Sequence, residues 1–212
     1  NVCHIIVSAH VLKLLSQSGA QVLIHGLPGV GKDAVMAEVA HSEPTQQIGG
    51  LQGWLQASSD AVFRQQLIDL FATHQPSVVR GLENDAKAAI ASIKSWLGSN
   101  SGWVLFVEDV SPTSSTVWDV LPPIQPECGR VVMTGQSELN TDERHFPGSR
   151  VHLRPFKTAQ CIELLRNLNV VDEADLDRPE FAVFLEERLG NLPLSVAMCG
   201  HLARNLEGPD KV

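Results

Sequence analysis

Hydrophobic and polar positions follow two different periods along the first 155 residues of the chain. Short, mostly apolar runs bounded by turn residues are typical of strands buried in a sheet. They predict strands at residues 21–25, 53–57, 103–107, 130–134 and 150–153. Apolar residues that recur every three or four positions predict helices at residues 9–18, 32–41, 60–74 and 84–97. Strands that alternate with helices or long crossovers indicate an α/β fold built on a parallel sheet.

The pattern changes beyond Pro155, where it predicts helices alone. We expect a helix over residues 158–168 with Thr158 as its cap, and another over residues 180–189. A third is expected over residues 192–205, with Pro193 in its first turn. The chain is therefore predicted to form an α/β domain over residues 1–155 and a helical companion domain over residues 156–212.

Composition and charge exclude several classes of protein. The 212 residues are 43% hydrophobic, which is ordinary for a globular chain. A net charge of −8 argues against affinity for nucleic acid or anionic lipid, and no apolar run approaches the ~20 residues of a membrane-spanning helix. We expect neither partner. The widely spaced Cys3, Cys128, Cys161 and Cys199 are expected to be buried thiols rather than disulfides or zinc ligands. A chain that begins at Asn1 without a leader is expected to be part of a longer protein.

Residues 26–32 (GLPGVGK) match the GxxxxGK pattern of a phosphate-binding loop. The glycines let backbone N–H groups converge on an anion, and the lysine and the following helix N-terminus add positive potential. The loop leaves a predicted strand and opens a predicted helix, which is the arrangement that the motif requires. The residues expected to contact phosphate are Gly26, Pro28, Gly29, Val30, Gly31, Lys32, Asp33 and Ala34.

A second apolar strand is followed by Glu108 and Asp109. A P-loop enzyme needs carboxylates at such a strand end to hold Mg²⁺ and to orient water. The alternative is a glycine-rich turn beside a solvated strand end, which leaves the strand, loop and helix order as coincidence.

One position departs from the motif. Asp33 follows Lys32 where a Ser or Thr hydroxyl usually ligates Mg²⁺. A carboxylate is itself a Mg²⁺ ligand, but without the metal it repels phosphate oxygens of the same sign. Alternatively, Asp33 only complements the helix dipole in the first turn. The sequence leaves both roles open.

Four segments resemble the NB-ARC (AP-ATPase) branch of the STAND nucleotide-binding switches, the family of apoptosome scaffolds and plant immune receptors. HGLPGVGKDAVMAEVA, from residue 25, resembles the family's phosphate loop, and WVLFVEDV, from residue 103, its second acidic motif. GRVVMTGQS, from residue 129, is similar to the strand that usually ends in Thr-Thr-Arg. GNLPLSVAMCGHL, from residue 190, resembles the GLPL motif. The resemblance extends over nearly the whole chain.

The resemblance implies a parallel-sheet P-loop NTPase domain followed by a small all-helical domain, with ADP or ATP and Mg²⁺ between them. It implies that Glu108 is a metal ligand, with Asp33 as a second, and that Asp109 orients the attacking water as the catalytic residue. It further implies that Thr134 senses the γ-phosphate and that Pro193 packs on the base. Taken alone, Pro193 is also consistent with an ordinary helix start.

Two differences from the family predict weak hydrolysis. Asp33 replaces the usual Thr or Ser, and Gln136 stands where the family commonly has an Arg that reports on the γ-phosphate. A glutamine hydrogen-bonds phosphate without offsetting its charge. Alternatively, Gln136 is a solvated residue after a strand. We expect at most a slow ATPase.

The sequence is best interpreted as the adenine-nucleotide-binding core of a cytoplasmic signalling switch, whose nucleotide state controls oligomerisation. Its expected partners are an adenine nucleotide, a second copy of the chain, and flanking signalling or repeat domains. The alternative is a scaffold that keeps ADP bound without hydrolysing ATP. A small-molecule kinase is less favoured, because no mobile lid or acceptor pocket is indicated.

Overall fold

The α/β part of the chain is built on one parallel sheet. The computed structural model describes residues 2–48, 50–82, 84–121, 128–136, 148–170, 172, 176 and 178–206. Five strands lie in the order β2-β3-β4-β1-β5, and every pair is parallel. The strands are β1 (Gln21–His25), β2 (Gln52–Gln56), β3 (Val104–Val110), β4 (Arg130–Gly135) and β5 (Ser149–His152). This confirms the predicted α/β fold with a parallel sheet.

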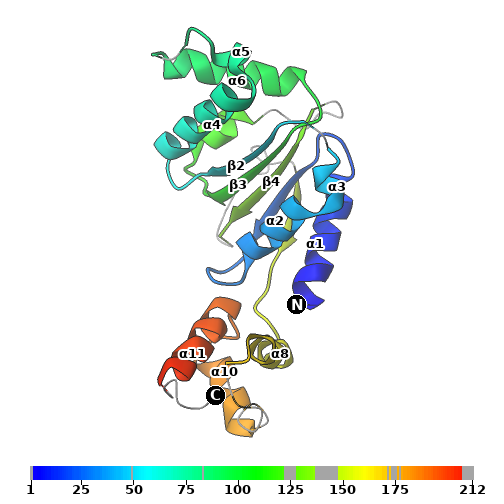
Figure 1. Ribbon diagram of the computed structural model, residues 1–212, viewed down its shortest axis with the longest axis vertical. Helices are drawn as coiled ribbons and strands as arrows, with labels where there is room; N and C mark the ends of the chain where they lie inside the picture. The colour runs from blue at the N-terminus through cyan, green and yellow to red at the C-terminus, as the bar shows by residue number, and fades with distance from the viewer. Residues whose placement is uncertain are drawn as a thin grey trace.

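Helices cover the sheet and form the C-terminal part of the chain (Figure 1). Those of the α/β part are α1 (Val2–Leu15), α2 (Lys32–His41), α3 (Glu43–Gln46), α4 (Asp60–His74), α5 (Pro76–Val79), α6 (Ala86–Ser99) and α7 (Ser115–Val120). The later ones are α8 (Thr158–Leu168), α10 (Pro179–Glu187) and α11 (Pro193–Leu206). Within the described residues, no helix is both long and apolar enough to cross a membrane.

Alternate side chains of each central strand enter two different cores, as the two-residue period of a strand requires. Val22 and Ile24 of β1 pack with helices α1 and α2, whereas Leu23 between them packs with α4, α6 and α7. In β3, Val104 and Phe106 face the core beside α1 and α2, whereas Leu105 and Val107 face the core beside α4, α6 and α7. Figure 1 shows the sheet between these two helical layers. Burial on both faces explains why the central strands are continuously apolar.

The C-terminal helices have an apolar core of their own. It includes Phe156, Cys161, Leu165, Leu185 and Val196, which are all buried. Gly200 of α11 lies so close to α8 that a Cβ there would come within 2.7 Å of the Leu165 side chain. This separate core is consistent with the expected domain boundary near residue 156, which stays a prediction. Residues 207–212 of the expected helical domain lie outside the described residues.

Several predicted boundaries are wrong. Helix α1 begins at Val2 rather than Ala9, because Val7 continues the apolar stripe of Val11 and Leu15 one turn further toward the N-terminus. The short helices α3, α5 and α7 were not predicted, since four to six residues show no clear helical period. Thr158 is the first residue of α8 rather than its cap. The backbone N–H of Lys157, just before the helix, donates to the Gln160 side-chain oxygen at 2.7 Å.

Two side chains, those of Trp54 and Cys199, are accessible to solvent. Trp54 is 40% exposed, because β2 is an edge strand, and its ring stacks on Phe106 with a centroid separation of 5.6 Å. Cys199 is partly exposed, whereas Cys128 and Cys161 are buried as predicted. The Cys3 side chain lies outside the described residues.

Candidate nucleotide-binding site

The glycine-rich segment joins β1 to α2 at the carboxyl edge of the sheet, where ligands bind in open α/β folds. Gly29 and Gly31 have φ angles of 77° and 95°, in the left-handed region that favours glycine. Gly26 is required for a different reason, because a Cβ there would lie 2.3 Å from the carbonyl oxygen of Leu153. The three glycines therefore hold a tight loop against β5 and at the start of α2.

Lys32 begins α2 and folds back across the loop. Its side chain is buried, and its Nζ donates to the carbonyl oxygens of Gly26 and Leu27, at 3.1 Å each. Burial lowers the pKa of Lys32, and the nearby negative charges of Asp33 and Asp109 partly offset this effect. The ammonium group therefore lies inside the loop, between backbone carbonyls and carboxylates.

A β-bulge brings two acids to the edge of the sheet beside the loop. Strand β3 pairs Val107 with Met133, but the next pairing is Val110 with Gly135, so Glu108 and Asp109 share the space opposite one residue of β4. Bulges of this kind re-aim side chains next to functional sites. The strand was predicted to end before the two acids, but they lie inside it. Asp109 has a φ of 55°, which is uncommon outside glycine.

Thr134 is the residue opposite the bulge, and it joins the two acidic segments. Its hydroxyl accepts a hydrogen bond from the backbone N–H of Asp109 and donates one to Asp33 Oδ1, both at 3.2 Å. The side chain is fully buried. Asp33 is therefore held by β4 as well as lying in the first turn of α2, where it complements the helix dipole.

Negative charge accumulates around Glu108. Its pKa is raised by burial, then by the charge of Asp33 and more weakly by Asp109. Hydrogen bonds from Gln56, at 3.5 Å, and from Trp54 act in the opposite direction. These oxygen donors suit Mg²⁺ chemically. However, the described residues contain no group of three acids, cysteines or histidines placed to hold a metal ion by themselves. Water or phosphate oxygens would have to supply the rest of a Mg²⁺ coordination shell here.

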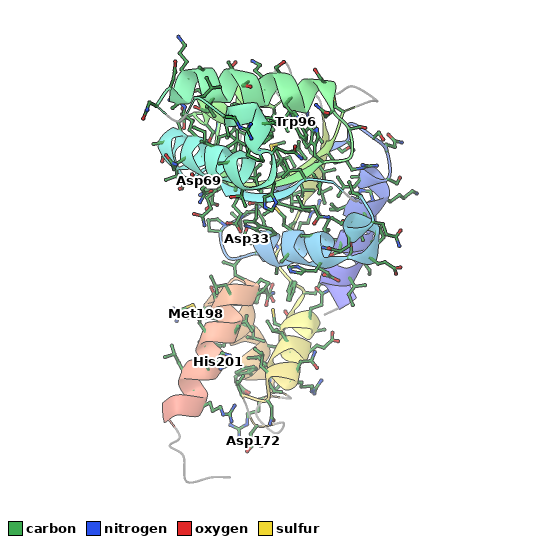
Figure 2. All side chains as sticks on the ribbon, turned by 45° about the horizontal axis from the view of Figure 1, so that its top comes forward. Asp33, Asp69, Trp96, Asp172, Met198 and His201 are labelled. Carbon is green, nitrogen blue, oxygen red and sulfur yellow. The ribbon has the colours of Figure 1, made fainter. Side chains whose placement is uncertain are left out.

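The C-terminal helices contact the loop directly. Pro193 and Leu194 form the first turn of α11, and the Leu194 N–H donates to the Gly29 carbonyl oxygen at 3.2 Å. Asn191, with a φ of 53°, precedes this turn, and its carbonyl oxygen accepts the Phe156 N–H at 3.0 Å. Figure 2 shows Asp33 on the side of the α/β part that faces these helices. The structure thus brings the GLPL-like turn to the phosphate loop.

Gln136 lies just past β4 and is exposed. It lines a hollow of about 400 Å³ together with Asp109, Ser58 and Ser111. The bulge acid and the glutamine therefore border the same space at the carboxyl ends of β3 and β4.

A histidine pair beside the loop was not predicted. His25 and His152 end two adjacent strands, and their rings stack with centroids 4.9 Å apart and planes inclined by 8°. Burial lowers the pKa of His25, and the neighbouring His152 and Arg150 lower it further. The pair joins residues that are far apart in sequence, so only the strand order could have revealed it.

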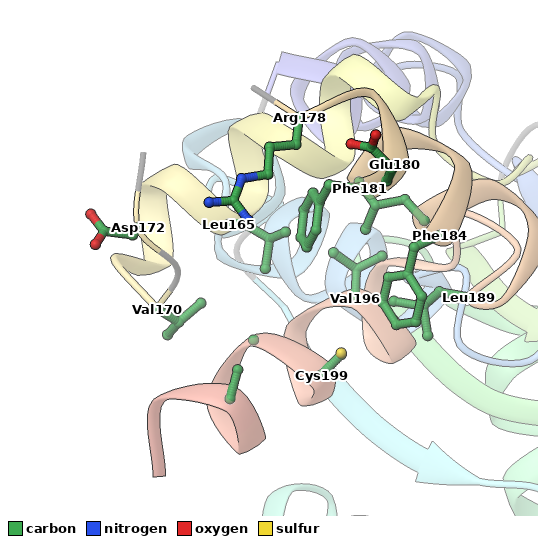
Figure 3. Close-up of a pocket in the computed structure, with 13 residues that line it drawn as sticks. Leu165, Val170, Asp172, Arg178, Glu180, Phe181, Phe184, Leu189, Val196 and Cys199 are labelled. Carbon is green, nitrogen blue, oxygen red and sulfur yellow. The ribbon is translucent and has the colours of Figure 1, made fainter. Parts of the chain in front are cut away.

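The helical part contains a separate hollow of about 420 Å³ (Figure 3). Its apolar wall includes Phe181, Phe184 and Val196, and Asp172 and Arg178 lie at its rim. Residues of the phosphate loop do not line it.

The parallel sheet, with a GxxxxGK loop between β1 and α2, defines a P-loop NTPase fold. Solved structures with this fold include a STAND protein with a tetratricopeptide repeat sensor from Pyrococcus horikoshii, 19% identical with a TM-score of 0.53. The match covers 89% of this chain and 28% of that protein. The ORC1 protein of Aeropyrum pernix, in complex with DNA, is 15% identical with a TM-score of 0.64. That match covers 94% of this chain and 59% of ORC1. The Aeropyrum pernix ORC2 protein, in ADPNP and ADP complexes, is 14% identical with a TM-score of 0.55, over 95% of this chain and 62% of ORC2.

The likeness shows the fold alone at these identities. It is shared by STAND and origin-recognition proteins, so it does not single out the NB-ARC branch. No family model and no curated protein matches the sequence. The expectation that nucleic acid is not a partner gains no support, since similar structures include ORC1 in complex with DNA and Drosophila ORC bound to DNA. The chain spans less than two thirds of each of these neighbours.

Proposed function

We propose that the chain is the adenine-nucleotide-binding core of a STAND-type signalling switch. The contact of Leu194 with Gly29 carries this proposal, because it joins the helical part to the loop that would hold the phosphates. A nucleotide held there is sensed by both parts of the chain. ADP would favour a closed state, in which the helical part stays against the phosphate loop. ATP would favour an open state that associates with other copies of the chain.

The positions of individual residues support the following roles. Lys32 and the loop N–H groups would bind the phosphates, with Gly26, Pro28, Gly29, Val30, Gly31, Asp33 and Ala34 around them. Mg²⁺, when bound with the nucleotide, would offset phosphate charge, with Glu108 and Asp33 as its nearest carboxylates. Asp109 would orient water, and Pro193 would contact the base.

One observation favours the scaffold as a second candidate. Asp33 occupies the position of the metal-binding hydroxyl and is engaged by Thr134. A site arranged in this way suits ADP better than ATP, because the additional carboxylate opposes additional phosphate charge. In such a scaffold, ADP would stay bound as a structural element and would not be turned over. Single-turnover hydrolysis of labelled ATP distinguishes the two candidates.

The first test is to identify the nucleotide that co-purifies with the protein and to measure ADP affinity by calorimetry. Lys32→Ala should weaken ADP binding on the order of tenfold or more, because a charge-assisted contact is lost. Lys87→Ala, which changes an exposed lysine on α6, is the matched control. Equal affinity of wild type and Lys32→Ala would refute this placement of the phosphates.

A further inference from the structure

The Thr134 hydroxyl has one proton, and the structure shows where that proton goes. The hydroxyl donates to Asp33 Oδ1 at 3.2 Å and accepts the Asp109 N–H at 3.2 Å. A threonine hydroxyl has a single donor and two acceptor lone pairs. The same hydroxyl therefore cannot donate to Asp33 and to a phosphate oxygen at once. As long as the bond to Asp33 persists, Thr134 has no proton to offer a γ-phosphate.

Release of Asp33 has a cost that depends on the surroundings. The negative charge of Asp33 disfavours ionisation of Glu108, raising its pKa, and favours the charged form of Lys32. A carboxylate freed from Thr134 without a cation would face phosphate oxygens of the same sign. With Mg²⁺ present, the carboxylate has an alternative partner of opposite charge. The bond from Thr134 occupies only one oxygen of this carboxylate. It does not exclude Mg²⁺, but it limits how freely the carboxylate can turn toward the metal.

We propose that Thr134 is a positioning residue that acts on the nucleotide through Asp33. Its hydroxyl holds the Asp33 carboxylate toward β4, and this sets how strongly ATP binding depends on Mg²⁺. Thr134 itself does not contact phosphate in this proposal. The inference rests on the proposed nucleotide site and adds a determinant of its preference between diphosphate and Mg²⁺-bound triphosphate.

Thr134→Val removes the hydroxyl and keeps the shape of the side chain. In magnesium-free buffer, the freed Asp33 carboxylate should weaken ATP binding about threefold to tenfold. With saturating Mg²⁺, ATP affinity should equal or exceed that of the wild type, because the Asp33 carboxylate is no longer held toward β4 and can turn to the metal. The ATP dissociation constant without Mg²⁺, divided by the one with Mg²⁺, should therefore rise on the order of tenfold relative to the wild type. ADP affinity should change less. Thr134→Ser restores the hydroxyl and should restore the ratio.

A double-mutant cycle with Asp33→Ala tests whether Thr134 acts through Asp33. In the Asp33→Ala background, Thr134→Val should leave the magnesium ratio unchanged. A merely structural role would lower the melting temperature and weaken ADP and ATP alike, in both backgrounds. If Thr134 instead contacts the γ-phosphate directly, Thr134→Val should weaken ATP binding even with Mg²⁺ and even in the Asp33→Ala background. Either result would overturn the proposal.

Failure of the proposed function has a different signature. If the wild type binds neither ADP nor ATP, or if Lys32→Ala has no effect, the nucleotide site itself is wrong. If the wild type binds both and the cycle shows no coupling between Thr134 and Asp33, only the positioning role is wrong. Thermal melting of all variants without nucleotide confirms that each one folds.

Discussion

The backbone N–H of Leu194, in the first turn of α11, donates to the carbonyl oxygen of Gly29 in the phosphate loop at 3.2 Å. The Leu194 side chain also covers this glycine, since a Cβ on Gly29 would lie 3.4 Å from Leu194 Cβ. A hydrogen bond and an apolar contact therefore connect the helical part to the loop, and a ligand that orders the loop should order the first turn of α11 as well.

We predict that ADP slows amide hydrogen exchange both in residues 26–34 and in residues 191–196. Leu194→Ala should reduce the second effect, because it removes the side chain that covers Gly29. Met198→Ala, one turn later on the same face, is the matched control, since the two side chains are 56% and 57% exposed. Protection confined to residues 1–155 would contradict the predicted link between the two parts.

Glycine substitutions should separate the effect of backbone conformation from that of close contact. Gly98→Ala, in α6 with open space around it, should stabilise the protein by roughly 0.5–1 kcal/mol. Gly81→Ala, with a φ of 79° and open space, should destabilise by about 1–2 kcal/mol. Gly26→Ala should destabilise more than Gly81→Ala and should impair nucleotide binding, because its Cβ would overlap the Leu153 carbonyl.

Urea denaturation of the three variants gives the required differences in unfolding free energy. If Gly26→Ala costs no more than Gly81→Ala, the loop does not depend on its close approach to Leu153.

Much of this fold is readable from the sequence because the relevant signals are local. The bounds of β1, α2, α4 and α8 are as predicted, since the apolar pattern that marks each of them lies within a short stretch of sequence. The exposure of Trp54 could not be predicted in this way, because whether a strand lies at the edge of a sheet depends on the order of all the strands.

In the candidate site, too, the local features could be predicted and the contacts between distant residues could not. The GxxxxGK loop is a contiguous motif, so its position between β1 and α2 could be predicted. The bond between Thr134 and Asp33 joins residues 101 positions apart, and the bulge at Asp109 depends on the pairing of β3 with β4. Neither feature leaves a local pattern in the sequence, because both arise from contacts between distant segments.

The raised pKa of Glu108 has a consequence for stability. A carboxyl group whose pKa is higher in the folded state binds more protons when folded, so the folded state loses stability as the pH rises from the ordinary value of 4.5 through the raised value. Glu108→Gln should therefore raise the melting temperature at pH 7 in the absence of Mg²⁺ and nucleotide. This gain in melting temperature should shrink below pH 4.5, where the Glu108 carboxyl is protonated in both the folded and the unfolded state.

Glu186→Gln, on the exposed face of α10, is the matched control for this measurement. Melting curves without Mg²⁺ between pH 4 and pH 8 give the comparison. If Glu108→Gln is less stable than the wild type at pH 7, favourable contacts of the carboxylate outweigh its burial and the repulsion from Asp33.

The charge of Asp33 should weaken ATP binding in the absence of Mg²⁺. Asp33→Thr replaces the carboxylate by the hydroxyl that a phosphate loop usually has, and Asp33→Asn removes the charge but keeps an oxygen that can accept from Thr134. Without Mg²⁺, both variants should bind ATP more tightly than the wild type, on the order of tenfold, because the repulsion between carboxylate and γ-phosphate is gone. ADP affinity should change less, since ADP carries less negative charge.

The two variants should differ when Mg²⁺ is added. Only Asp33→Thr offers the metal its usual hydroxyl ligand, so only this variant should gain single-turnover hydrolysis, provided that Asp109 orients the water. Calorimetry with and without Mg²⁺ and a single-turnover assay with labelled ATP measure both effects. If the wild type already hydrolyses ATP at an ordinary P-loop rate, Asp33 is as competent a metal ligand as the usual hydroxyl, and the predicted repulsion of the γ-phosphate is wrong. Weaker ATP binding by Asp33→Thr in the presence of Mg²⁺ would lead to the same conclusion.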